Sequence, residues 1–147
     1  MLVPWHRALA VLVDRLRIDP RLAGVAVYSG AVDPELAGLE SIQFSGIQEA
    51  AEWRQLGTSA LEASATVTGL VWVTRHGEAE NAIRSARQRA DELRQCITEA
   101  LWDDPTLGGA VQAAWIDGAS YDQGVSADGA RACRVTFTVR MTAWIRR

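Results

Sequence analysis

The chain contains no lysine, no excess of positive charge and no long apolar run, and these absences exclude several classes of protein. Its 15 basic side chains are all arginines and its acidic side chains number 18, so the formal net charge is −3. That balance does not favour a surface that grips nucleic acid. We attribute the missing lysine to the codon bias of a GC-rich genome. No apolar run is long enough for a membrane span, and the first residues lack the features of a signal peptide, so we expect a cytoplasmic chain.

Residues that carry chemistry are equally scarce. The chain has two cysteines and two histidines. Cys96 and Cys133 fall within predicted elements, and we expect both to be small core residues of a reducing compartment. There is no glycine-rich phosphate loop, no nucleophile elbow and no metal-ligand spacing. We therefore predict no catalytic residue, no metal and no cofactor, with His76 as the single candidate general base.

Hydrophobic periodicity predicts two helices. The longer one begins at Glu78 and ends before Pro105, where Gly108 and Gly109 allow the chain to reverse. Its apolar side chains recur at steps of three and four residues: Ile83, Ala86, Ala90, Leu93, Ile97, Ala100 and Leu101. An earlier helix is predicted over residues 3–18, with an apolar stripe of its own.

Alternation predicts strands over residues 22–28, 41–45, 58–74, 110–117 and 131–145. The last strand is the clearest, because apolar side chains occupy every second position: Cys133, Val135, Phe137, Val139, Met141, Ala143 and Ile145. We expect a loop over residues 29–39, with or without a helical turn at 33–36, and either a helical turn or an irregular loop over 48–56. Residues 118–130 have turn chemistry; they form a long loop unless the flanking strands extend further.

One-sided alternation beside two amphipathic helices predicts an α+β fold: a mostly antiparallel sheet with two helices packed on one face. The 147 residues fit a single domain.

Tryptophans in polar surroundings are the unusual feature of the sequence. Trp72 and Trp144 fall on the mainly polar faces of their strands, and Trp53 lies in a polar stretch. Either loops and neighbouring strands cover them, or they lie at subunit contacts, where Trp and Arg are enriched. A sheet with one face free of helices is well suited to packing against another copy.

The order of these parts resembles the tail terminators of long-tailed bacteriophages, the lambda-type minor tail protein and its relatives. The segments that carry the resemblance are the strand end 69–73 (GLVWV), the helix 86–90 (ARQRA), its end 101–109 (LWDDPTLGG), and the strand 134–139 (RVTFTV). It covers roughly residues 56–145, and residues 29–56 have no counterpart that we can place.

This resemblance implies a ring, expected to be a hexamer, that caps the head-proximal end of the tail tube in the virion. Such a ring stops polymerisation of the major tail tube protein and presents a surface to a head completion or connector protein. DNA crosses its lumen only as cargo, and the chain is assembled in the host cytoplasm without a membrane or an active site.

We choose the candidate interface residues because we expect their side chains to be exposed, and not because the family uses the corresponding positions. The candidate docking segments are 118–130 and 43–56, and one helix face is a candidate ring contact. The individual candidates are Trp53, Trp72, Arg84, Arg87, Arg94, Tyr121, Asp122 and Trp144.

Other functions remain open at this point. One is a small cytosolic ligand-binding or regulatory domain, which needs a pocket with convergent polar groups. Another is a hydrolase or transferase that uses His76. A third is a different head–tail connector protein of the same kind of virion.

Overall fold

The computed structural model describes residues 4–32, 39–55, 60–125 and 129–146. The elements follow in the order α1 (Trp5–Ile18), the short 3-10 helix η1 (Pro20–Leu22), β1 (Ala26–Tyr28), β2 (Glu40–Gln55), β3 (Ala60–Arg75), α2 (Ala79–Asp103), β4 (Ala113–Val125) and β5 (Arg131–Arg146). The strands form one sheet in the order β1-β2-β3-β5-β4. Every pairing is antiparallel except that of β1 with β2.

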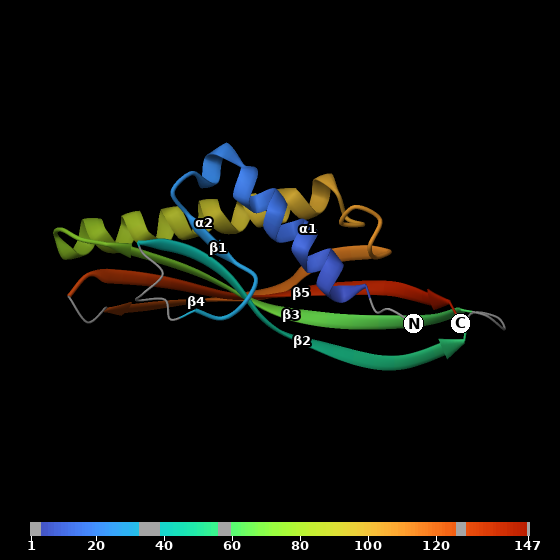
Figure 1. The fold of residues 1–147 in the computed structure, drawn as a ribbon. Helices are drawn as coiled ribbons and strands as arrows, with labels where there is room; N and C mark the ends of the chain where they lie inside the picture. The colour runs from blue at the N-terminus through green and yellow to red at the C-terminus, as the bar shows by residue number, and fades with distance from the viewer. Residues whose placement is uncertain (1–3, 33–38, 56–59, 126–128, 147) are drawn as a thin grey trace.

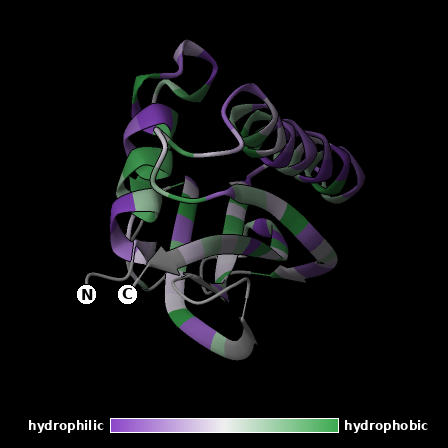
Figure 2. Cartoon of the chain, turned by 90° about the vertical axis from the view of Figure 1, so that its right-hand side faces the viewer, coloured by the Kyte–Doolittle hydropathy of each residue, from purple (hydrophilic) through white to green (hydrophobic). Residues whose placement is uncertain are grey.

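Both helices lie on the same face of the sheet (Figure 1). The predicted α+β architecture is therefore confirmed. From here on, the face that packs against α1 and α2 is called the inner face, and the opposite one the outer face. In Figure 2 the sheet curls beneath the two helices. This curl follows from the right-handed twist that strands of this length accumulate.

The apolar periodicities predict the core well. Ala86, Ala90, Leu93, Ile97 and Leu101 of α2 are buried, as are the inward residues of β5 from Cys133 to Ala143; the side chain of Ile145 lies outside the described ones. Ile83 and Ala100 are half-buried at the margin. Cys96 and Cys133 are both buried free thiols, as expected of small core residues.

A glycine at the centre of the inner face makes room for an aromatic pair. Gly69 of β3 is paired with Phe44 on one side and Phe137 on the other. The two phenyl rings meet edge to face, with centroids 5.9 Å apart, and both are about 1% exposed. The Phe137 ring lies so close over Gly69 that any side chain there would collide with it.

Local capping fixes the ends of α2. The Glu78 carboxylate accepts hydrogen bonds from the backbone N–H groups of Glu80 and Asn81 at the N-terminus. At the other end Asp104 accepts from the Gly108 N–H at 2.7 Å and forms an ion pair with Arg15 of α1. The pair ties the end of α2 to α1.

Several predicted boundaries are wrong. Residues 22–28 are not one strand, because Asp19 caps a 3-10 turn over Pro20–Leu22 and only Ala26–Tyr28 pairs with β2. Residues 48–55 are neither a helical turn nor a loop, since β2 continues to Gln55. The proposed turn at 33–36 lies outside the described residues.

The segment 118–130 is also mainly strand, which confirms the alternative that the flanking strands run further. β4 extends to Val125 and β5 begins at Arg131. A β-bulge between Ile116 and Ala119 absorbs the turn-forming Gly118, whose φ of 90° is favourable for glycine.

Candidate functional site: the outer face of the sheet

The outer face is the side of the sheet that neither helix covers (Figure 1). Threonines occupy its centre, where Thr68 of β3 is paired with Thr138 of β5, and Leu70 with Thr136. Hydroxyl-bearing and β-branched side chains suit a strand face that is only partly buried. The centre of the outer face is therefore uncharged, and its charges and aromatic rings lie toward the two ends.

One end of the outer face carries two exposed tryptophans. Trp115 of β4 lies opposite Arg140 of β5 and is 40% exposed, and Trp144 of β5 is 54% exposed. The Arg140 guanidinium forms an ion pair with Asp117 at 3.2 Å. This region, made of Trp115, Arg140 and Trp144, is called the tryptophan end below. Its composition is that of protein-interface hot spots, which favour Trp and Arg.

The other end of the outer face contains a small hollow. Trp72 lies opposite Arg134, and Arg134 forms an ion pair with Asp122 of β4 at 3.3 Å. These three residues, with Gln123, Gly124 and Ala132, line a space of about 180 Å³. It is large enough for one side chain of a partner.

Buried polar atoms lie beside this hollow. Ser41 is paired with Trp72, and Gln43 follows it on the same face. The Ser41 hydroxyl, the Gln43 amide nitrogen and the Trp72 indole nitrogen are buried, and none of them has a hydrogen-bond partner among the described residues. Gln43 does accept from the Val32 N–H at 2.8 Å, so the segment after β1 reaches this corner of the outer face at Val32.

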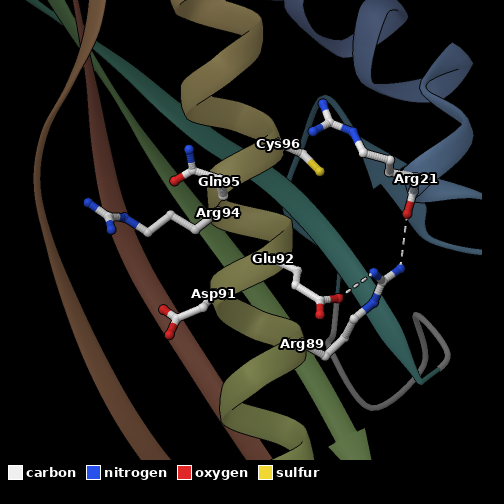
Figure 3. Close-up of a pocket in the computed structure, with 7 residues that line it drawn as sticks. All are labelled: Arg21, Arg89, Asp91, Glu92, Arg94, Gln95 and Cys96. Carbon is white, nitrogen blue, oxygen red and sulfur yellow. Dashed lines mark hydrogen bonds and ion pairs between the residues drawn. The ribbon is translucent and has the colours of Figure 1, made fainter.

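A larger open hollow of about 770 Å³ lies over α2, lined by Arg21, Arg89, Asp91, Glu92, Arg94, Gln95 and Cys96 (Figure 3). Most of its charges already have partners. Arg89 binds Glu40 and Glu92, both at 3.0 Å, and donates to the Arg21 carbonyl at 3.2 Å. This network fastens η1 and the start of β2 to the helix, and it engages several of the charged groups that line the hollow.

The opposite side of the same helix turn contacts β4. Asp91 and Arg94 project from α2 away from Arg89 (Figure 3). Arg94 donates to the Tyr121 hydroxyl at 3.2 Å. Partial burial is the main cause that raises the pKa of Tyr121, and a hydrogen bond with Asp91 raises it further. Tyr121 therefore holds the extended part of β4 against the helix.

The structure separates the eight predicted interface residues into groups. Trp72 and Asp122 come together on the outer face, whereas Trp144 lies ten pairs away along β5, at a distance of about 30 Å. Arg94 and Tyr121 meet on the inner side. Arg84 and Arg87 are exposed on α2, and Arg84 pairs with Glu80. The backbone of Trp53 belongs to β2, and its side chain lies outside the described ones.

Three outer-face residues were missed by the sequence analysis: Trp115, Arg134 and Arg140. The alternation of β5 already placed both arginines on the polar face. Trp115, however, can be assigned to the outer face only from the strand register that places it opposite Arg140. That register is a property of the folded sheet.

The described residues offer little catalytic chemistry. They contain no group of three or more His, Cys, Asp or Glu side chains arranged to hold a metal ion. Burial raises the pKa of both Cys96 and Cys133, so their thiols stay protonated and weakly nucleophilic near neutral pH. His76 is exposed in the turn between β3 and α2. Within the same residues, no helix combines the length and apolarity needed to cross a bilayer.

Comparison with known proteins identifies the fold. No protein-family model and no curated protein matches the chain. Among solved structures, a chain from the virion of a native gene transfer agent particle is similar, with a TM-score of 0.56 and 18% identity. The match covers 92% of this chain and 94% of the other, so the two have a similar fold over nearly their full lengths.

Proposed function

We propose that this chain is a structural virion protein that caps the head-proximal end of a phage or phage-like tail tube. In this role it forms a ring, expected to be a hexamer, ends polymerisation of the major tail tube protein and presents a surface to the head completion or connector protein. It acts by binding alone and uses no catalytic residue, metal or cofactor. DNA passes through the ring as cargo.

The observation that carries the proposal is the exposed outer face with its tryptophan end. Trp115 and Trp144 are large apolar side chains that a monomer leaves in water, and burying each of them against a partner would be favourable. The fold is shared over nearly the full length with a chain of a gene transfer agent virion. The order of segments in the sequence, which resembles that of tail terminators, supports the same role.

The charge pattern of the outer face also suits the proposal. Arg134 and Arg140 of the outer face are each paired with an aspartate of the neighbouring strand β4. The net charge of −3 also disfavours tight binding of the DNA that passes through the ring. Weak binding of DNA suits a ring through which DNA must move.

The test is to add the purified protein to polymerising major tail tube protein and to measure tube lengths by electron microscopy. Tubes should become shorter and end in a ring at one extremity. Trp144→Ala should weaken binding to tube ends by about tenfold, because truncated hot-spot aromatics cost 1–2 kcal/mol or more.

Trp102→Ala is the matched control, since Trp102 is 71% exposed but belongs to the last turn of α2 and not to the sheet. It should cap tubes as well as the unsubstituted chain does. Unchanged tube lengths in the presence of the folded, unsubstituted protein would refute the capping role.

A further inference from the structure

The sheet leaves two strand edges unpaired. Among the strands that the structure describes, β4 is hydrogen-bonded only to β5, and no described strand lies along the other edge of its 13 residues. On the opposite side of the sheet, β1 covers only Ser41–Gln43 of β2. Beyond that point the outward edge of β2, from Phe44 to Gln55, has no strand beside it within the described part of the chain.

The edge of β4 carries little protection against pairing. After the bulge at Ile116/Ala119 the strand runs regularly from Ala119 to Val125, a length of about 24 Å. All seven of these residues are exposed, none is proline, and Asp122 is the only one with a charge. Natural proteins normally blunt such an edge with charges, prolines or a covering segment, so an edge left bare is suited to receive another strand.

The directions of the strands show how a second copy would fit. The four long strands alternate in direction across the order β2-β3-β5-β4, so β2 and β4 run in opposite directions. If the next copy continues the sheet in the same orientation, its β2 lies antiparallel to β4 of the first. Antiparallel pairing is the slightly more stable of the two ladders.

We propose that copies of this chain join head to tail, with the open edge of β4 pairing with the edge of β2 beyond β1 in the next copy. This inference rests on the ring of the proposed function and names its subunit contact. A two-fold dimer through β4 alone would leave the β2 edge of both copies open. Head-to-tail pairing uses both edges, and such a contact closes into a ring when the rotation between successive copies adds up to a full turn. The copies are displaced along the strands, as strands in a closed barrel are, so that β1 does not obstruct the contact.

Amide hydrogen exchange of the full chain, compared between dilute and concentrated solution and on capped tubes, tests this contact. In the assembled state, peptides covering 44–55 and 113–125 should both exchange more than about tenfold more slowly, because their outward N–H groups become hydrogen-bonded. Peptides from α1 serve as the internal control and should not change.

Each alternative outcome contradicts the inference in a distinct way. Protection of 113–125 alone indicates a two-fold dimer through β4. Assembly without protection of either segment indicates contact through faces, and a chain that stays monomeric both in solution and on tubes has no such pairing. Protection of both segments in rings that fail to cap tubes would refute the proposed function and leave the edge contact standing.

A pair of variants adds an independent readout. Gln48→Lys places a charge on the exposed edge strand β2 and should abolish assembly while leaving the monomer folded. Gln88→Lys puts the same charge on the exposed side of α2 and should assemble normally. Equal assembly of the two variants would overturn the proposed contact.

Discussion

Replacing Gly69 by alanine tests the packing on which the sheet depends. A Cβ at this position would lie 2.1, 2.3 and 2.7 Å from three carbons of the Phe137 ring, where real contacts are never closer than about 3 Å. The ring cannot simply retreat, because it is about 1% exposed and its neighbour Phe44 stands edge-on to it. One methyl group therefore forces either the ring or the strand to move.

Overpacking of this kind costs about 1–3 kcal/mol, whereas the stiffer unfolded chain of an alanine variant returns about 0.4–1 kcal/mol. The clash is the larger effect, so we expect Gly69→Ala to lower the free energy of unfolding. The central values leave a net loss of about 1.3 kcal/mol, so with a urea m value of about 2 kcal/mol/M the midpoint should fall by about 0.6 M. Urea denaturation followed by circular dichroism measures this shift directly.

Gly124→Ala is the matched control, because Gly124 also lies in a strand and a Cβ there would meet nothing within 4 Å. Its midpoint should stay the same or rise slightly. Combining Gly69→Ala with Phe137→Leu should give less destabilisation than the sum of the two single changes, since the smaller side chain makes room for the methyl group. Equal stability of the Gly69→Ala and Gly124→Ala variants would refute the conclusion that the Phe137 ring leaves no room for a methyl group at position 69.

Two further predictions concern the core and its polar border. Val135→Asp should abolish the cooperative unfolding transition, because it buries an unpaired carboxylate on the inner face; Thr68→Asp, on the outer face of the adjacent strand, should melt nearly normally. Burial alone would raise the pKa of Glu40, but hydrogen bonds from two arginines lower it below its ordinary value. Glu40 therefore stabilises the fold above a pH of about 4.3, and this stabilisation disappears as the pH falls through the lowered value. The difference in unfolding free energy between the unsubstituted chain and Glu40→Gln should accordingly shrink as the pH is lowered. Glu80→Gln, which removes an exposed ion pair, should change the stability little at any pH. A difference for Glu40→Gln that stays constant with pH would refute the pairing.

The sequence by itself determined which side of each main element faces the core. The steps of three and four residues in α2 and the alternation in β3 and β5 reflect the geometry of a single element, so they can be read without knowing its neighbours. The predictions that two helices share one face, that both cysteines are core residues and that Trp144 points to the outer face follow from this, and they are confirmed.

Only the tertiary structure decided where strands continue through sequence that has no strand signal of its own. Residues 48–55 are mainly polar without strand-like alternation, and residues 118–125 are rich in turn formers. Yet β3 and β5 supply long neighbouring ladders, and pairing satisfies backbone N–H and C=O groups that a loop would leave to water. The same long-range register brings Trp115 beside Arg140, and Trp72 beside Arg134 and Asp122, while it carries Tyr121 to the opposite side against α2. A contact between residues far apart in the chain depends on strand order and register, and local periodicity contains neither.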